Sequence, residues 1–505
     1  MLSIIQQQLR NPDKTAIIAH GHSYSFQDLQ TGSQQFARTL LKNSADLAEM
    51  RVAFMVVPGF DYVRVQWGIW QAGGIAVPLC ITYPLASLQY VIEDTEAEII
   101  VVSPEFESVL TDYSAQQGIR LIVLGADDKP APVGVLPPVT LSHRALILYT
   151  SGTTNLPKGV VTTHANIDAQ VSTLVQAWAY SEQDIILCVL PLHHVHGIIN
   201  VISCTLWAGG TVEFLPNFAP EKVFDWFAKI ALGSQDGLFM AVPTIYFKLI
   251  AYFDQLPEAQ KQALTASMAT FRLMVSGSAA LPVSVMEKWE TISGHRLLER
   301  YGMTEIGMAI SNPYEGERRA GHIGQALPGV QIRLVDEQHN DVAPGVDSPG
   351  EILVKGANVF QEYWRKKEAT EATFTTDGWF KTGDVAVLDD SYYKILGRNS
   401  VDIIKSGGYK ISALEIEEVL RTYPQINDCS VVGLDNEEWG ELVVAALVVN
   451  DGSLDLTVLN AWIREKMPAY KVPRQYKIVD DLPRNAMGKV TKNELKKIFV
   501  VVSGS

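Results

Sequence analysis

The sequence of 505 residues is poor in cysteine and in net positive charge. Its four cysteines, Cys80, Cys188, Cys204 and Cys429, are scattered without metal-ligand or redox spacing, which is typical of a reducing compartment. The net charge of −15 argues against a nucleic-acid partner. The first residues lack a charged region followed by a long apolar one, so we expect no signal peptide and predict a cytoplasmic protein.

Uninterrupted apolar runs long enough for a membrane span are also scarce. The segment 185–207 is strongly apolar, but it contains Pro191, Gly197 and Asn200 together with three histidines. A buried strand, loop and helix therefore fit this segment better than a membrane span. There are no internal repeats. The composition, 47% hydrophobic and 19% charged, is ordinary for a globular chain of more than one domain.

Short β-rich runs alternate with helix-length segments over much of the chain. We expect helices at 25–42 and 62–72, and strands at 52–57, 75–78, 99–102, 121–124, 211–215, 238–242 and 273–275. This alternation predicts an α/β fold in which helices cover both faces of mixed, mostly parallel sheets. From 331 to 390 the pattern changes to short strands with turns, including 331–335 and 350–354, which predicts a small antiparallel, barrel-like part.

A small, mobile α+β domain is predicted to follow, dividing the chain into residues 1–398 and 399–505. Its expected elements are strands at 401–405, 429–433, 442–449 and 476–479, with helices at 413–423 and 456–466. Ser412 to Glu415 forms a capping box at the entrance of the first helix. Residues 464–497 carry ten Lys or Arg and four Asp or Glu, which suits either an anionic ligand or a solvated charged face.

The stretch from Leu148 to His164 is the strongest candidate for a phosphate site. Hydroxyl residues surround a glycine and a lysine follows: Thr150, Ser151, Gly152, Thr153, Thr154 and Lys158. Such residues let backbone N–H groups and O–H donors converge on an anion, while the lysine adds positive charge. The spacing is not that of the common P-loop. A polar surface loop would explain any one of these residues, but not all of them between two apolar runs.

Four later stretches carry further candidates. Glu305, after Thr304 on a glycine-containing turn, could hold Mg²⁺, which prefers one or two carboxylates with phosphate oxygens. Asp384 follows a tight turn and suits the two hydroxyls of a ribose, to which Arg398 could add a donor. Lys489 lies behind a glycine on a loop. Taken singly, each of these could be structural, and their order along the chain is the informative observation.

That order resembles the adenylate-forming superfamily of acyl-CoA synthetases, luciferases and adenylation domains. The shared motifs are the hydroxyl-rich stretch, Tyr301–Glu305, Thr382–Asp384, Gly397–Arg398 and the late Gly488–Lys489, and they extend over nearly the whole chain. Within the superfamily, the stretches 190–197, 241–244, 275–281 and 298–329 make the sequence most similar to malonyl-CoA synthetases. Its resemblance to their mitochondrial branch rests on two stretches, 400–405 and 407–410.

The resemblance implies a role for each motif. The hydroxyl-rich stretch and Lys158 would bind the ATP phosphates. Ser278, Ala279 and Tyr301 would line the adenine and acyl sites, and Asp384 and Arg398 would bind the ribose. Thr304 would contact the α-phosphate, and Glu305 would hold Mg²⁺. Lys489 would bridge the reacting carboxylate and the α-phosphate. Gly407 and Gly408 would border the coenzyme A tunnel, with His194 at its acyl end. Candidate acyl-substrate residues are Arg300, His194, Ser276 and Arg318.

Two positions depart from the family pattern. Asn155 replaces a usual glycine, but asparagine tolerates a left-handed backbone better than other residues with a side chain. Ser400 stands at the hinge position, where aspartate or lysine is commoner; a small polar residue can still absorb a backbone rotation.

The implied reaction joins a carboxylic acid to coenzyme A through an acyl-adenylate, with ATP and Mg²⁺. Arg300 is the basis for predicting a short dicarboxylate, most simply malonate. A guanidinium in an apolar acyl pocket would be costly unless it pairs with a second carboxylate. Alternatively, Arg300 pairs with Glu299 or another neighbour and only shapes the pocket. His196 could assist, or it could be a core histidine; the lack of a third nearby ligand argues against zinc.

Other readings stay open. The acid could be methylmalonate or a short or medium monocarboxylate, or the enzyme could load a carrier protein instead of coenzyme A. A non-catalytic nucleotide-binding protein is a further alternative, against which the joint presence of Lys489, Glu305 and Asp384 argues. We expect small-molecule partners only, with no nucleic acid and no membrane, and a monomer or homodimer.

Overall fold

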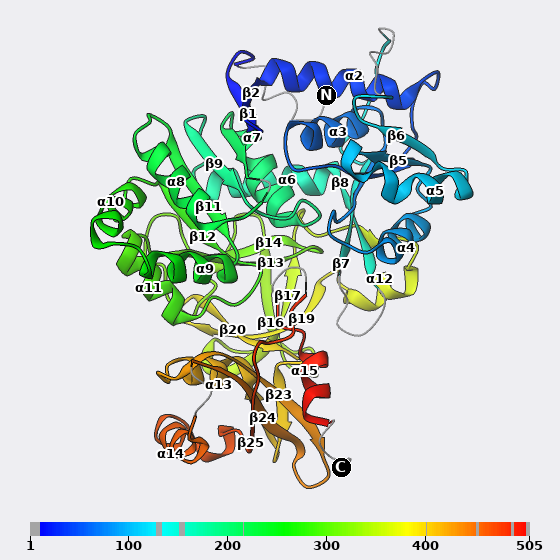
Figure 1. The fold of residues 1–505 in the computed structure, drawn as a ribbon. Helices are drawn as coiled ribbons and strands as arrows, with labels where there is room; N and C mark the ends of the chain where they lie inside the picture. Colours follow the sequence, from blue (N-terminus) through cyan, green and yellow to red (C-terminus); the bar gives the residue numbers. More distant parts are fainter. Residues whose placement is uncertain are drawn as a thin grey trace.

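The computed structural model describes residues 11–127, 134–150, 157–215, 217–399, 401–450, 454–485 and 489–500. Their strands form four sheets. Figure 1 shows three of these sheets with most of the helices in the larger part of the molecule. The fourth sheet lies at one end with α13 (Ala413–Arg421), α14 (Leu456–Lys466) and α15 (Lys492–Val500).

The nine-stranded sheet carries the acyl-side residues. Its order is β15 (Gln325–Ala326), β14 (Gly307–Ser311), β13 (Leu298–Met303), β12 (Leu273–Ser276), β11 (Asp236–Ala241), β9 (Asp184–Cys188), β10 (Thr211–Phe214), β1 (Thr15–Ala19), β2 (His22–Ser25). Pairing is parallel from β13 to β1 and antiparallel at both edges. An aromatic core packs on one face beneath α8 (Pro220–Ala231), α9 (Pro243–Asp254), α10 (Glu258–Met268) and α11 (Val283–Ser293).

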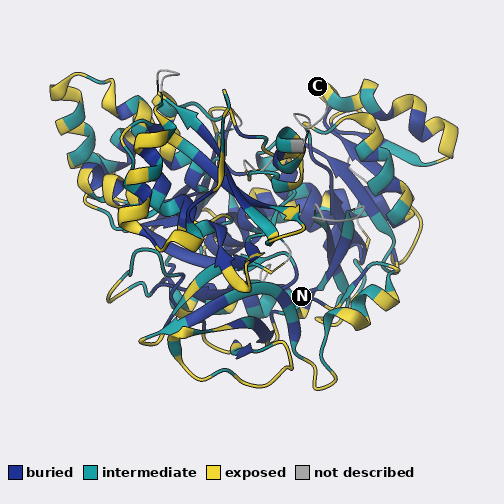
Figure 2. Ribbon diagram, turned by 90° about the horizontal axis from the view of Figure 1, so that it is seen from below, coloured by how far each residue is buried: buried dark blue, intermediate teal, exposed yellow. Residues whose placement is uncertain are grey.

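The seven-stranded sheet carries the hairpin of the phosphate stretch. Its order is β18 (Glu362–Tyr363), β8 (Lys158–Thr163), β7 (Arg144–Thr150), β4 (Ile75–Pro78), β3 (Arg51–Met55), β5 (Ile99–Val102), β6 (Arg120–Val123). The accompanying helices are α2 (Phe26–Leu41), α3 (Phe60–Gln71), α4 (Leu85–Thr95), η2 (Pro104–Phe106), α5 (Glu107–Gln117), α6 (His164–Ala177) and α12 (Lys367–Thr373). Phe36, Trp67 and Trp70 are fully buried in the main core. Figure 2 shows buried strands flanked by helices with exposed outer faces.

The predicted elements of this larger part are confirmed, several of them to the residue. Helix α2 starts at the capping box of Ser25 and Asp28, because each side chain accepts from the backbone N–H of the other. The apolar segment 185–207 contains strand β9, a π-helix η3 (His196–Ser203) and the short helix α7 (Cys204–Trp207). Within the described ranges, no helix is long and apolar enough to cross a membrane.

The third sheet is antiparallel, as predicted for residues 331–390. It runs β16 (Gln331–Val335), β17 (Gly345–Lys355), β19 (Phe380–Asp389), β20 (Tyr392–Arg398). Strand register places Asp384 opposite Arg398, so the two motifs that the sequence separates meet on neighbouring strands.

The fourth sheet forms the C-terminal part. Its strands are β22 (Tyr409–Ser412), β21 (Ile403–Ser406), β24 (Gly440–Val449) and β23 (Ile426–Asn436), and β25 (Gln475–Ile478) pairs with β24; η4 (Ala469–Lys471) precedes β25. The predicted strand 401–405 begins two residues later, because the N–H groups of Val401 and Asp402 turn back to the carbonyl of Arg398. Ser412 caps α13 by accepting from the N–H of Glu415, so the predicted capping box is half formed; the Glu415 carboxylate pairs with Lys471 instead.

Candidate active site

The phosphate stretch is carried by the hairpin of β7 and β8. Thr150, the last residue of β7, pairs with Lys158, the first residue of β8. The predicted residues Ser151, Gly152, Thr153 and Thr154, together with Asn155, lie outside the described residues. The ammonium group of Lys158 lies 4.9 Å from the ring centroid of Tyr363 on the neighbouring strand β18.

Glu305 is held by a residue that sequence reasoning missed. The phenol of Tyr363 donates a 2.9 Å hydrogen bond to Oε1 of Glu305, across 58 residues of sequence. Burial raises the pKa of Glu305, while the Tyr363 bond and the charges of Arg398 and Lys158 oppose that rise. No pattern in the neighbouring sequence marks Tyr363, because only the pairing of β18 with β8 brings it to the site. Tyr363 therefore links the metal candidate to the phosphate lysine.

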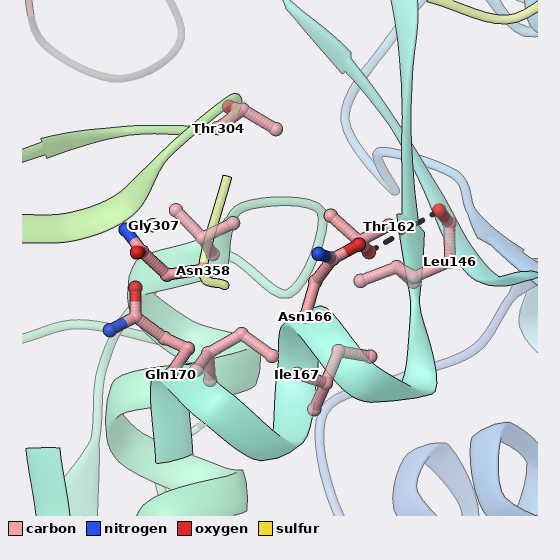
Figure 3. Close-up of a pocket in the computed structure, with 10 residues that line it drawn as sticks. Leu146, Thr162, Asn166, Ile167, Gln170, Thr304, Gly307 and Asn358 are labelled. Atoms are coloured by element: carbon pink, nitrogen blue, oxygen red, sulfur yellow. Dashed lines mark hydrogen bonds between the residues drawn. The ribbon is translucent and has the colours of Figure 1, made fainter. Parts of the chain in front are cut away.

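The turn that carries Thr304 and Glu305 rests on polar side chains from other elements. Thr304 and Gly307 line a small pocket with Asn166, Gln170 and Asn358, whose side chains point toward it in Figure 3. Asn358 donates to the carbonyl of Ile306 at 2.6 Å, and Gln170 accepts from the N–H of Met308. A Cβ at Gly302 would lie 2.0 Å from the carbonyl oxygen of Gly307, so glycine is required there. The turn is thus fixed from both sides.

Asp384, Arg398 and Tyr301 form one hydrogen-bonded group. The Tyr301 hydroxyl donates to Oδ2 of Asp384 at 2.6 Å, and Nε of Arg398 donates to Oδ1 at 3.1 Å. Burial opposes the charge of Arg398, but Asp384 outweighs it and raises the arginine pKa. Burial and the adjacent carboxylate raise the pKa of Tyr301, so the phenol stays protonated. The structure brings these three predicted nucleotide residues together and fixes the orientation of the carboxylate.

Arg300 points away from this group because successive strand residues face opposite sides of the sheet. It is 3% exposed, and its guanidinium lies against Gly277, where an added Cβ would come within 2.5 Å. One bond is formed, from Nη2 to the hydroxyl of Ser278 at 3.3 Å, whereas Nε has no partner among the described residues. Burial lowers the pKa of this guanidinium. Arg300 is therefore a buried cation whose Nε donor is unused within the described chain.

Glu299 does not neutralise Arg300 by a direct bond. Its Oε1 accepts from the N–H of Leu281 at 3.1 Å, and its Oε2 has no partner within the described chain. Burial raises the pKa of Glu299 to about 8, the charge of Glu418 adds to the rise, and Leu281 and Arg300 oppose it. The alternative of a simple Glu299–Arg300 pair is thus not what the described side chains form.

The loop after β12 places three more candidates beside Arg300. Ser276 is fully buried at the end of the strand, and its hydroxyl has no partner among the described residues. Ser278 takes a left-handed backbone conformation with φ 71° and lies 3.2 Å from Nδ1 of His196. Ala279, which follows it, is exposed. A serine between a histidine and an arginine can transmit the position of one to the other.

His196 is buried, His194 is half-buried, and both rings are neutral. Burial lowers the pKa of both rings, and nearby cations add to the effect: Lys489 for His194 and Arg300 for His196. Neither Nε2 has a hydrogen-bond partner in the part of the chain that the structure describes. Like Nε of Arg300 and Oγ of Ser276, each Nε2 is therefore a buried polar atom without a hydrogen bond to the described residues.

Lys489 reaches this region from the C-terminal part. Its backbone is held by Asn485, whose Oδ1 accepts from the Lys489 N–H at 3.0 Å. Desolvation by the surrounding protein lowers the pKa of its ammonium, even though the residue is exposed at the surface; Arg398 and Arg300 lower it further, while Asp384 and Glu305 oppose them. The electrostatic neighbours of Lys489 are therefore the predicted nucleotide, metal and acyl residues.

Three other predictions have different outcomes. Gly407 and Gly408 form the turn between β21 and β22 with φ 57° and 82°, and the N–H of Gly407 donates to Trp439 at 2.8 Å. Ser400, the predicted hinge, lies outside the described residues. Arg318 is not brought to Arg300: its guanidinium donates to the backbone carbonyls of residues 296, 313 and 314.

The site suits one divalent cation held jointly with phosphate. Glu305 supplies a buried carboxylate, and across the described chain there is no cluster of three His, Cys, Asp or Glu side chains that could bind a metal alone. Mg²⁺ usually takes one or two carboxylates and completes its shell with phosphate oxygens and water. The donor set therefore fits Mg²⁺ that arrives with a nucleotide.

Comparisons with known proteins agree with this geometry. A model of the AMP-binding enzyme family matches residues 5–364, and a model of the AMP-binding enzyme C-terminal domain matches residues 415–489. The mitochondrial malonate–CoA ligase of Homo sapiens is 43% identical over 96% of this chain and 90% of its own length. ATP-bound MatB from Rhodopseudomonas palustris has a TM-score of 0.90 at 33% identity, with 99% of each chain covered. The o-succinylbenzoate CoA synthetase of Bacillus subtilis, in complex with ATP and a magnesium ion, has a TM-score of 0.84 at 26% identity, with 98% of this chain and 99% of that chain covered.

Proposed function

Because the chain belongs to the AMP-binding enzyme family, we propose that it is an ATP-dependent malonate–CoA ligase. The reaction converts malonate, ATP and coenzyme A to malonyl-CoA, AMP and pyrophosphate through a malonyl-adenylate. Two observations support this proposal: the 43% identity to the human malonate–CoA ligase and the buried Arg300, whose Nε has no partner among the described residues. The second observation carries the substrate class.

In the first half-reaction, one malonate carboxylate attacks the α-phosphorus of ATP. A carboxylate oxygen–phosphorus bond forms, and the bond to pyrophosphate breaks. Asp384, oriented by Tyr301 and Arg398, holds the ribose. Lys489 carries positive charge to the reacting carboxylate and α-phosphate, where negative charge accumulates. Catalysis here is positioning and charge stabilisation more than covalent chemistry by the protein.

A bound Mg²⁺ would neutralise phosphate charge during this step. Glu305 would hold it, oriented by the hydroxyl of Tyr363. Lys158, beside the same tyrosine ring, would contact the phosphates. These residues bind and orient the phosphate groups, and none of them takes part in a covalent step.

The second carboxylate of malonate selects the substrate. Arg300 pairs with it, because a guanidinium offers planar donors that match a carboxylate. Its bond to Ser278, which contacts His196, fixes the guanidinium before the substrate arrives. A monocarboxylate would leave the buried cation unpaired, at a cost on the order of 3–5 kcal/mol. The pocket therefore favours a short dicarboxylate.

In the second half-reaction, the thiol of coenzyme A attacks the acyl carbon. A carbon–sulfur bond forms, AMP leaves, and the thiol proton passes to solvent. We propose that the part beyond residue 398 rotates between the two half-reactions, withdrawing Lys489 and presenting the turn of Gly407 and Gly408. We likewise propose that the boundary between the two domains falls between residues 398 and 399. We also propose that the protein is cytoplasmic.

The test is AMP release from ATP and Mg²⁺, with and without coenzyme A, across malonate, methylmalonate, succinate, acetate, butyrate and octanoate. We expect coenzyme A-dependent release with malonate as the preferred acid. Preference for butyrate or octanoate would keep the ligase and reject the dicarboxylate pocket. Preference for methylmalonate would keep the pocket and change the acid. Failure of every acid would reject the proposed function.

A further inference from the structure

Helix α11 lacks a cap of its own. It begins at Val283, and the preceding Pro282 has no side chain that can accept a hydrogen bond from the first turn. The acceptor comes from α13, where Oε1 of Glu418 receives the N–H of Val283 at 2.8 Å, from 135 residues away. A carboxylate at a helix N-terminus is stabilised by this hydrogen bond and by the partial positive charge of the helix end.

This contact joins the two parts of the chain. Glu418 lies on α13 in the C-terminal part, whereas α11 covers the nine-stranded sheet of the larger part. A second direct bond, between Lys410 and Glu337 at 2.7 Å, is made by two exposed side chains and therefore contributes little. Glu418 is only partly exposed and is bonded to a backbone N–H. Its contact therefore depends more strictly on the relative orientation of the two parts than the Lys410–Glu337 bond does.

The same orientation places Lys489 among the active-site charges. The charge of Lys489 lowers the pKa of His194. In turn, Arg300 lowers the pKa of Lys489, and Asp384 and Glu305 raise it. The contact of Glu418 with α11 and the approach of Lys489 therefore occur together. A rotation of the C-terminal part would end both.

The residues just before α11 belong to the acyl side. Glu299 accepts from the N–H of Leu281, two residues before the N–H that Glu418 accepts. Ser278, in its left-handed conformation, bonds Arg300 and His196 a few residues earlier. Two carboxylates, one from each part of the chain, thus fix the end of the loop 277–282.

We infer that Glu418 is a positioning residue for adenylate formation, which fixes loop 277–282 and α11 only while Lys489 is at the site. The inference rests on the proposed two-step reaction and assigns a coupling element to it. The rotation that brings Lys489 to the site then also aligns the Ser278–Arg300 pair. The thioester half-reaction, which follows rotation, does not use this contact.

The experiment compares Glu418→Ala and Glu418→Gln with the wild-type chain. The control is Glu415→Gln on the same helix, because Glu415 is exposed and pairs with Lys471 inside the C-terminal part. Adenylate formation is measured by malonate-dependent exchange of pyrophosphate into ATP. Thioester formation is measured in a single turnover, by adding coenzyme A to enzyme that already holds the adenylate.

We expect Glu418→Ala to slow exchange by about tenfold, the loss of one charge-assisted hydrogen bond. Glu418→Gln, which keeps an acceptor without charge, should slow it less. The coenzyme A step and the Glu415→Gln control should stay at wild-type values, whereas the melting temperature of Glu418→Ala should fall only slightly, by the loss of one helix cap. Normal exchange in both Glu418 variants, or equal slowing of both half-reactions, would overturn the inference.

Failure of the proposed function gives a different result. In that case the wild-type chain shows no malonate-dependent exchange, and the same comparison of half-reactions is made with the acid that does support exchange. The ratio of the two rates then decides the role of Glu418, independently of which acid the pocket prefers.

Discussion

The nucleotide side and the acyl side of the site differ in how their polar groups are satisfied. On the nucleotide side, Asp384 accepts from Tyr301 and Arg398, and Glu305 accepts from Tyr363. On the acyl side, buried atoms lack hydrogen-bond partners within the described ranges: Arg300 Nε, Ser276 Oγ, His194 Nε2 and His196 Nε2.

This difference separates two tasks. Groups that are already bonded to one another keep their geometry before a nucleotide binds, so the nucleotide side is preorganised. Buried donors without partners raise the energy of the empty site, and a ligand with matching acceptors removes that cost. The nucleotide side therefore provides alignment, whereas the acyl side provides discrimination between acids.

The largest expected effect tests the acyl side. Arg300→Ala should lower kcat/KM for malonate by about 1,000-fold, because the second carboxylate would be buried without a cation. The KM for ATP should change little, since Asp384, Arg398 and Tyr301 remain bonded. Steady-state kinetics with malonate and butyrate measure both quantities. If malonate turnover survives the change while butyrate turnover does not improve, Arg300 is not the selector.

Lys489 lies between the two sides and should affect both. Lys489→Ala should slow pyrophosphate exchange by about 100-fold, the usual scale for losing one electrostatic donor of a transition state. Coenzyme A transfer from the preformed adenylate should be spared. Equal losses in both half-reactions would contradict this division.

The pH dependence gives a second reading of Lys489. Its pKa is lowered by desolvation and by the charges of Arg398 and Arg300, and the protonated form is the one required, so exchange should fall as pH rises through a pKa below 10.5. Lys489→Arg should move this fall to higher pH, because arginine keeps its proton. An unchanged alkaline limb in that variant would assign the fall to another group.

On the nucleotide side, Asp384→Asn should raise the KM for ATP by about thirtyfold, because a charged acceptor for the ribose is lost. Tyr301→Phe removes only the neutral donor that orients this carboxylate, so we expect about a threefold rise. In both variants the preference for malonate over butyrate should persist. A changed acid preference would show that the two sides are not separate.

The smallest effect is expected at Tyr363. Tyr363→Phe removes the hydrogen bond to Glu305 and should raise the Mg²⁺ concentration needed for half-maximal activity by about threefold. Tyr392→Phe is the matched control, because that hydroxyl donates to the carbonyl of Glu317 instead. A Mg²⁺ titration at saturating ATP separates the two variants, and identical curves would leave Tyr363 without a role at the metal.

The sequence predicted local features well, because they depend on neighbouring residues. The helix that starts near Ser25, the N-cap at Ser412, the short buried strands β4 and β5, and the antiparallel region after residue 331 follow from patterns within a few residues. Motif order singled out Asp384 and Arg398 as candidates, and the structure places them opposite each other on neighbouring strands.

Contacts between distant segments could not be read in this way. Tyr363 with Glu305, His196 with Ser278 and Glu418 with Val283 are separated by 58, 82 and 135 residues. The local pattern around each residue does not reveal which distant residue it contacts. Arg318 shows the opposite case. Its place near the acyl motifs made it a candidate, but its guanidinium donates to backbone carbonyls and not toward the acyl side. Side-chain pairing depends on the packed sheets, which the periodicity of single segments does not specify.

The π-helix His196–Ser203 makes the geometry of the acyl side sensitive to the number of residues in this segment. All eight of its residues are buried, and His196 at its start contacts Ser278. A π-helix fits more residues into each turn than an α-helix, so deleting one residue would tighten the segment and rotate the preceding side chains by about 100° relative to those that follow. A single-codon deletion here would therefore re-aim His196 without altering any contacting residue. Diversification of the acyl pocket among descendants of this chain can proceed through length changes as well as substitutions.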